Sequence, residues 1–313
     1  MGTYILRSLI RAVITMFLVV TLVFAALRLS PIDPAQYILG DYATAEALKG
    51  MRHEMQLDRP LYVQYLNFLN SLFHGDLGRS YINKLEVLPQ LVDVLPYTLE
   101  LVFFGTLAGL LMGVPAGIIA AIKHNSVFDH SLRLMSLVGI AIPIFISGIF
   151  LITVFSLWLD LLPIIGGIGK ETLKSRALNL ILPVFSCGIW MMASIARLTR
   201  AAMLDVLKKD YIMTARAKGL RESIVIYKHA LKNSILPLIT FLGIYINILL
   251  GSAVLIEVVF TRPGVGRLIV ESIMSGDFPI VQSVIMLYAG AVVVVNLLVD
   301  FTYSLVDPRI VYK

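Results

Sequence analysis

The sequence has almost no cysteine and little charge. Cys187 is the single cysteine among 313 residues, so no disulfide can form within the chain, and its apolar neighbours suit a small buried side chain. Charged residues make up only 15% of the chain, whereas hydrophobic residues make up 58%. This composition is far too apolar for a soluble globular domain, including a soluble nucleic-acid-binding one. It indicates an integral membrane protein.

Patterns for catalysis and metal binding are also missing. The run from Gly166 to Glu171 superficially resembles a phosphate-binding loop, but Ile164 stands where the first glycine is needed and Glu171 where Ser or Thr is needed. The five histidines lie outside the apolar stretches and show no metal-ligand spacing. We therefore expect no catalytic residue, no metal site and no cofactor in this chain.

Six stretches are long and apolar enough to cross a hydrocarbon core of ~30 Å, which needs about 20 helical residues. Because they are continuously apolar, they predict helices and not the alternating strands of a barrel. They cover residues 9–29, 98–121, 132–158, 178–198, 234–258 and 281–305. The first is longer than the apolar part of a typical cleaved signal peptide, so we interpret it as a membrane helix. The prediction is an all-α membrane protein with six transmembrane helices.

The distribution of charge predicts the orientation. If both termini are cytoplasmic, that side carries 15 basic and 5 acidic residues, whereas the opposite side carries 11 basic and 14 acidic residues. The positive-inside rule then places the termini and the basic run from Arg197 to Lys232 in the cytoplasm. The first external loop is long enough to cross the membrane regardless of its charge, but the short loops agree.

The long external loop, residues 30–96, has structure of its own. Apolar residues recur in it at helical intervals, which predicts an amphipathic helix lying on the membrane or against the bundle. They are Tyr62, Tyr65, Leu66, Leu69, Leu72 and Phe73. The glycines of Gly75–Asp76–Leu77–Gly78 then allow a tight turn. A packed cap on the outer face is the simpler interpretation, and a direct substrate contact is the alternative.

Within the second stretch, glycines occur at every fourth position: Gly105, Gly109, Gly113 and Gly117. This spacing puts them on one helix face, where a neighbouring helix can approach closely. The neighbour belongs either to this chain or to another. Pro115 in the same stretch and Pro143 in the next each remove a backbone hydrogen bond and are expected to bend their helices.

The cytoplasmic run, residues 199–233, holds the main candidate site. Residues 204–218 favour helix, Gly219 supplies a stop, and helical propensity resumes from Glu222. We therefore predict two short helices joined at Gly219. Small residues alternate there with basic ones, which suits close docking into a groove of a protein partner better than contact with a lipid surface. The candidate coupling residues are Asp210, Thr214, Ala215, Arg216, Ala217, Lys218, Gly219, Leu220 and Arg221.

Together with His229, Asn233 and Pro237, the segment from Asp210 to Leu220 closely resembles the cytoplasmic coupling loop of ABC-importer permeases of the oligopeptide, dipeptide, glutathione and nickel branch. Motifs in the order typical of that branch support the resemblance along nearly the whole chain. They are Asp33–Pro34, Leu57–Asp58–Arg59–Pro60–Leu61, Gly75–Asp76–Leu77–Gly78, Pro143 with Phe145 and Gly148, Pro263 to Leu268, Asp277–Phe278–Pro279 and Asp307–Pro308–Arg309. Met213 and Thr214 depart from the Glu-Ala that opens the broader importer pattern.

The resemblance implies a single type I permease domain, residues 1–313, in the bacterial cytoplasmic (inner) membrane. The chain would form half of a heterodimeric pore with a second homologous permease. Two ATP-binding subunits would hold ATP and magnesium, and an external substrate-binding protein would deliver the cargo. The coupling residues would sit in a groove of one ATPase subunit, and this chain would catalyse nothing itself.

The resemblance also implies that the external segment after the fifth stretch dips toward the pore mouth. Its candidate residues for the pathway or outer mouth are Glu257, Pro263, Gly264, Gly266 and Asp277, and glycines there suit an irregular backbone. A structural corner is the alternative. For the cargo we expect peptides, including dipeptides, oligopeptides or glutathione; nickel or a metal chelate is the alternative. A self-contained secondary transporter is less favoured, because no ion site at the membrane midplane is evident.

Overall fold

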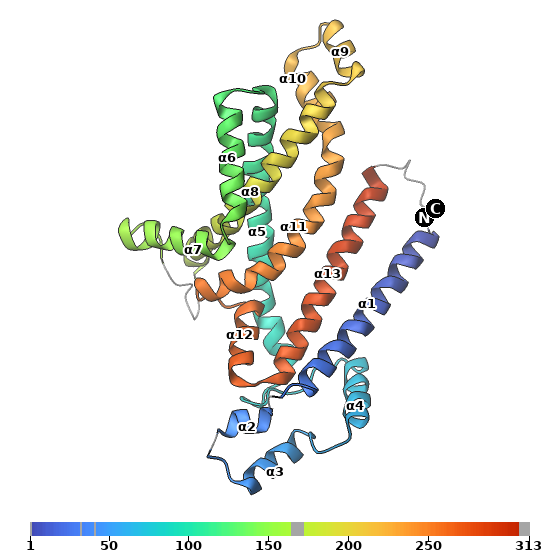
Figure 1. Ribbon diagram of the computed structural model, residues 1–313, viewed down its shortest axis with the longest axis vertical. Coiled ribbons are helices and arrows are strands. Elements are labelled where there is room, and N and C mark those ends of the chain that lie inside the picture. Colours follow the sequence, from blue (N-terminus) through green and yellow to red (C-terminus); the bar gives the residue numbers. More distant parts are fainter. Residues whose placement is uncertain (1, 32, 41, 164–171, 307–313) are drawn as a thin grey trace. The chain divides into compact units, whose positions relative to one another are not determined.

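The computed structural model describes residues 2–31, 33–40, 42–163 and 172–306 of the chain (Figure 1). Regular secondary structure in these residues is helical, and the one β-type contact among them is an isolated bridge between Arg79 and Glu86. The motif at Asp307–Arg309 and the run from Gly166 to Glu171 lie outside the described residues. The predicted all-α fold is confirmed.

The described helices follow one another along the chain. In order they are α1 (Gly2–Arg28), α2 (Pro34–Leu39), α3 (Ala45–Glu54), α4 (Leu61–Phe73), α5 (Val87–Ile122), α6 (Val127–Ala141), α7 (Ile144–Leu151), the π-helix η1 (Ile152–Trp158), α8 (Leu173–Leu207), α9 (Asp210–Ala217), α10 (Glu222–Ile224), the π-helix η2 (Val225–Leu231), α11 (Lys232–Val259), α12 (Val265–Ser275) and α13 (Phe278–Val306).

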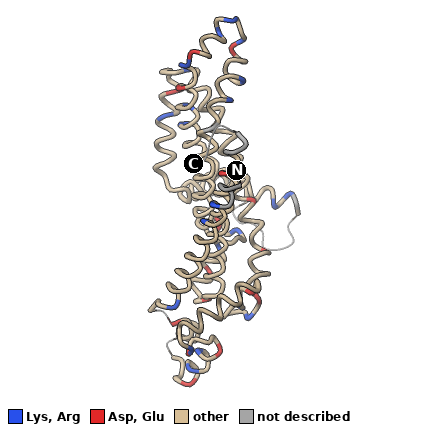
Figure 2. Tube along the Cα trace, turned by 90° about the vertical axis from the view of Figure 1, so that its right-hand side faces the viewer, with Lys and Arg blue, Asp and Glu red and all other residues tan. Residues whose placement is uncertain are grey.

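Five described helices, α1, α5, α8, α11 and α13, are each long and apolar enough to cross a membrane. Charged residues gather mainly near their ends and in the segments between them (Figure 2). The third predicted span, residues 132–158, is not one continuous helix. It is a pair, α6 followed by α7 and η1, bent by 101° at the break.

The bend has a local cause at Pro143. Proline has no N–H to continue the helix, and its ring disfavours helical backbone at the preceding residue. Ile142 accordingly has φ −81° and ψ 123°, in the extended region, and α7 begins directly after the proline. Pro115, by contrast, lies inside α5 without interrupting it. The prediction of a bend is therefore correct at Pro143, where it breaks the span.

One compact unit comprises Met1–Thr98 and Pro263–Val294. Its apolar core joins the first turns of α5 to α12 and α13, and it contains Val87, Leu91, Val265, Ile280 and Val284. The predicted amphipathic helix is present as α4, and it packs against α1. The ring centroids of Tyr65 and Phe68 lie 5.1 and 5.7 Å from that of Phe24.

The other unit comprises Leu99–Arg262 and the rest of α13. Within it the glycines of α5 face α8. A Cβ atom added at Gly105 or Gly109 would lie 2.7 Å from the Cβ of Cys187 or Met191, and one at Gly113 would lie 2.9 Å from the Cβ of Ile195. A Cβ at Gly117 would lie 2.5 Å from a backbone oxygen of α8. The glycines therefore pack within this chain, and we call this α5–α8 contact the glycine seam.

Replacing Gly109 with alanine tests the seam. The added methyl group would overlap the fully buried Met191, so we expect Gly109→Ala to lower the free energy of unfolding by about 1–3 kcal/mol. Gly251→Ala on α11 is the matched control, because nothing lies within 4 Å of its added Cβ. Thermal unfolding of the two variants in detergent would measure the difference. Equal midpoints would show that the seam is not tightly packed.

Candidate coupling site

The candidate site begins where α8 ends. α8 continues past the apolar stretch to Leu207, and Lys208 and Lys209 separate it from α9. The predicted single helix over residues 204–218 is therefore wrong in its first part. Lys209 has extended backbone, with φ −76° and ψ 146°, and propensity could not reveal this turn because lysine is an acceptable helix former. α9 and α10 lie beyond the end of α8 (Figure 1).

α9 ends in a tight turn at Gly219, as the sequence predicts. Gly219 has φ +75°, in the left-handed region that favours glycine, and its N–H donates to the carbonyl oxygen of Arg216 at 2.9 Å. Helix resumes at Glu222, and most of it is the π-helix η2. The predicted turn at Gly219 is therefore present, but the second short helix is wrong as a separate element, because η2 continues without a break into α11 at Lys232.

An ion pair closes this turn from outside. The Nη2 atom of Arg216 lies 2.6 Å from Oε1 of Glu222, and both side chains are about half exposed. The hydrogen bond from Arg216 lowers the pKa of Glu222. The pair is therefore ionised at neutral pH, and its small contribution is lost only as the pH falls through that lowered pKa.

The inner face of α9 is seated on the chain's own core. Ile212 and Ala215 are buried, and they pack in one apolar cluster with Ile118 of α5, Met203 of α8 and Val225 of η2. Ala215 thus faces inward, and its small size serves packing within this chain. The expectation that it lines a surface for a partner is corrected, because its exposed fraction is only 7%.

The outer face of this segment combines basic and apolar side chains. Tyr211, Met213, Leu220 and Tyr227 are 44%, 57%, 38% and 61% exposed. The remaining predicted coupling residues are also exposed: Asp210, Thr214, Arg216, Ala217, Lys218, Gly219 and Arg221. We call these eleven residues the coupling face. Large exposed apolar side chains beside charges are typical of protein interaction surfaces.

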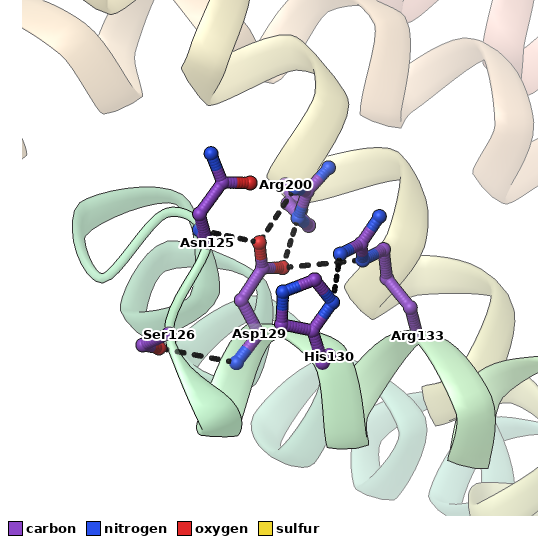
Figure 3. Close-up of polar contacts among 6 residues, drawn as sticks. All are labelled: Asn125, Ser126, Asp129, His130, Arg133 and Arg200. Carbon is purple, nitrogen blue, oxygen red and sulfur yellow. Dashed lines mark hydrogen bonds and ion pairs between the residues drawn. The ribbon is translucent and has the colours of Figure 1, made fainter.

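A buried ion pair that sequence reasoning missed lies near the base of this segment (Figure 3). Asp129 of α6 is fully buried, and its carboxylate accepts two hydrogen bonds from Arg200 of α8, the one from Nη2 measuring 2.7 Å. The backbone N–H of Asn125 donates to the same carboxylate at 3.0 Å. The Nε atom of Arg133 lies 3.9 Å away. Only the helix cap at Ser126, whose Oγ accepts from the N–H of Asp129, was readable from sequence.

Four of the five residues predicted for the outer mouth are buried, and Pro263 is the exception. Glu257 is fully buried at the end of α11, and Gly266 is buried within the regular helix α12. Asp277 is 2% exposed and accepts hydrogen bonds from the Ser80 hydroxyl and the backbone N–H of Tyr81. The segment that the glycines predicted to be irregular is thus mostly helical.

The other two outer-mouth residues precede α12. Pro263 lies in the short connection after α11, and Gly264 has φ −176°, an extended conformation open to any residue. A left-handed backbone occurs at Gly276, with φ +71°, where the segment meets α13. Among the described residues, no group of three or more His, Cys, Asp or Glu side chains is placed to hold a metal ion.

Comparison with known proteins identifies the family. Residues 113–312 match the family described as the binding-protein-dependent transport system inner membrane component, and residues 1–102 match its N-terminal membrane component. The chain belongs to this family. It is therefore a permease of the ABC-importer type and a multi-pass protein of the bacterial inner membrane, and the resemblance predicted from the motifs is confirmed. Members of the family are membrane components and not catalytic subunits.

Curated relatives extend over the whole permease. A probable peptide ABC transporter permease of Sinorhizobium fredii is 38% identical over 100% of both chains. A di/tripeptide transport system permease of Pseudomonas aeruginosa is 39% identical over 99% of both chains. A glutathione transport system permease of Escherichia coli K12 is 36% identical over 100% of both chains.

A solved structure supports the fold. The methionine ABC transporter MetNI in an inward-facing conformation contains a chain that matches this permease with a TM-score of 0.59 and 18% identity. The match covers 70% of this chain and 97% of the other chain. This similarity confirms the predicted type I permease fold.

Removing the buried carboxylate tests the pair between Asp129 and Arg200. Because Asp129→Ala leaves Arg200 largely buried without its partner, we expect it to lower the free energy of unfolding by about 3–5 kcal/mol. Glu222→Ala removes an exposed pair and is expected to cost at most about 1 kcal/mol. Thermal unfolding in detergent would measure both. A loss for Asp129→Ala no larger than that for Glu222→Ala would contradict the expectation.

Proposed function

We propose that this permease forms one half of the membrane pathway of an ATP-driven importer of peptides. The observation that supports the cargo class is identity of 36–39% over essentially full length to permeases whose names specify peptide, di/tripeptide or glutathione transport. Dipeptides, oligopeptides and glutathione all fall within the proposal. Nickel or a metal chelate is the alternative cargo.

The proposal assigns ATP chemistry to other subunits. A second homologous permease would complete the pathway, two ATP-binding subunits would hold ATP and magnesium, and an external binding protein would deliver the peptide. This permease would bind no cofactor of its own. Energy would enter through a protein contact, and the coupling face is the surface best suited to that contact.

The coupling face has the properties that docking on an ATPase requires. Tyr211, Met213 and Leu220 supply apolar area, whereas Lys218 and Arg221 supply positive charge. Tyrosine and arginine are enriched among the residues that contribute most to protein interfaces. The inner face of α9 is held by the core, so a push on the outer face would move α9 together with the structure beneath it.

The movement would reach the membrane along α8. This helix leads from the coupling face into the membrane, and Arg200 links it to α6 through Asp129. The glycine seam links it to α5. Closure of the ATPase subunits on ATP would thus shift α5, α6 and α8 together, toward the outward-open state. ATP on one side and the loaded binding protein on the other would bias this two-state element.

Two substitutions at Gly219 test the coupling face. Gly219 has φ +75°, so valine at this position would strain the turn, whereas asparagine tolerates this conformation. Nothing lies within 4 Å of an added Cβ, so the difference would report the backbone and not a clash. We expect the valine variant to insert normally, to recover less ATPase on purification and to lose uptake. The asparagine variant should retain both, and normal uptake by the valine variant would refute this role.

Uptake experiments on the complete complex test the energy source and the cargo. Replacing the Walker A lysine of the co-purifying ATPase should abolish uptake, because that lysine contacts the phosphates of the bound nucleotide. A secondary transporter would not need it. Uptake that survives would overturn the ATP-driven mechanism.

Mass spectrometry of the purified binding protein should identify a bound peptide, and recovery of nickel or a metal chelate in its place would overturn the cargo class.

A further inference from the structure

Helix α4 carries an exposed apolar stripe in the part of the chain predicted to lie outside the membrane. Tyr62, Leu66 and Phe73 are 68%, 60% and 87% exposed, and Leu69 lies between them half-buried. Successive members of this set are four, three and four residues apart, so they form one line along the helix. The stripe extends for about 16 Å at 1.5 Å per residue.

One side of α4 packs against the chain itself, whereas Asn67 and Asn70 are exposed on another side. Tyr65 and Phe68 face α1, where they pack on Phe24. Gln64, four residues before Phe68 and therefore next to it on the helix, is buried, and its Nε2 atom donates to the carbonyl oxygens of Leu57 and Arg59 at 3.3 and 2.8 Å. Folding therefore fixes the rotation of α4 about its own axis. As a result, the apolar stripe faces away from the rest of the chain.

The contact with α1 sets the depth of α4. The hydroxyl groups of Tyr65 and Thr21 lie 2.7 Å apart. Thr21 and Phe24 precede Arg28, the last residue of the span, by seven and four residues, or about 10 and 6 Å along the helix. The Arg28 guanidinium lies over the ring of Phe24, at 5.5 Å from its centroid, as expected of a cation at the membrane boundary. The middle of α4 is thus level with the outer end of a membrane span.

Two further observations identify what covers the stripe. α4 contains no Lys, Arg, Asp or Glu, although the loop around it is rich in them. The α1 surface at the same level is also apolar and open, since Leu18 and Leu22 are 53% and 66% exposed. Helices that lie in the membrane interface bury an apolar face by about 5–10 Å, and tyrosine is enriched at that depth. The depth of α4 and its lack of charged residues therefore both fit a helix in the membrane interface.

We propose that α4 lies in the leaflet on the external side, with Tyr62, Leu66, Leu69 and Phe73 in contact with lipid acyl chains. α4 then anchors the external segment to the bilayer. Gln64 ties α4 to the residues just before it, and the aromatic contacts tie α4 to α1, so the anchor would hold this part of the external loop at the membrane surface. This proposal is independent of the cargo and of the coupling face.

Fluorescent labels on adjacent residues of α4 test the proposal in the complete complex. Leu66→Cys and Asn67→Cys would each carry a small fluorophore, in nanodiscs of phosphatidylethanolamine and phosphatidylglycerol. Cys187 is fully buried, so unsubstituted protein measures background labelling. Phe17→Cys on α1 and Tyr42→Cys in the external loop serve as lipid and water references, because they are 55% and 103% exposed.

A phosphatidylcholine with a nitroxide on the fifth acyl carbon should quench most of the fluorescence at Leu66, as at Phe17, and little of it at Asn67. Iodide in the buffer should quench Tyr42 and Asn67 but not Leu66. Quenching of Leu66 by iodide would show that the stripe faces water and would overturn the proposal. Protection of Leu66 from both quenchers, lost when the second permease is omitted, would show that a protein covers the stripe and would also overturn it.

Discussion

Four glycines let the backbone of α5 lie directly against side chains of α8, and the arrangement beneath the coupling face depends on that distance. Gly117 approaches a carbonyl of α8 most closely, and the next α5 residue, Ile118, already belongs to the cluster that seats α9. Side chains in the seam would push α8 outward, and Met203 would then move away from Ile118. Gly188 of α8 reciprocates, since its added Cβ would lie 2.9 Å from that of Ala108. The contact is thus built from both helices.

The ion pair between α6 and α8 and the ion pair at the end of α9 differ in burial. The pair between Asp129 and Arg200 is almost fully buried, so separating its charges would leave them in a medium that solvates them poorly. The pair between Arg216 and Glu222 is half exposed, so water can replace either partner at a cost of about 1 kcal/mol or less. The contact between α6 and α8 is therefore held firmly, whereas the ion pair at the turn after α9 can separate at little cost.

Features that depend on local sequence could be predicted, and features that depend on packing could not. Continuous apolar stretches gave five of the spans, and spacing of four placed the seam glycines on one face. The glycines could not reveal that their neighbour is α8, because that requires the fold. Pro143 predicted a bend, but the bend angle of 101° depends on how the neighbouring helices pack. The turn at Lys208 and Lys209 has no signal of its own, since both residues also suit a helix.

Ala215 shows why residue size alone was ambiguous. A small side chain permits close approach from either side of a helix, and composition does not tell which side faces the core. The buried neighbours of α9 place Ala215 inward with Ile212, three residues apart on one face. The exposed side of α9 then consists of the larger residues between and beside them, namely Tyr211, Met213 and Arg216. Eight of the nine residues predicted for coupling are exposed, and Ala215 is the exception.

The basic residues between Arg197 and Lys232 have two separate roles, and their total number does not show which residue has which role. Orientation in the membrane depends on how many lysines and arginines a loop carries, whether or not they remain accessible after folding. Docking depends only on those that stay at the surface. Arg200 pairs with a buried carboxylate, whereas Arg216, although paired with Glu222, stays exposed like Lys218 and Arg221. Substituting the buried Arg200 would thus disturb the fold, whereas Lys218 and Arg221 are the residues through which the proposed docking would be tested.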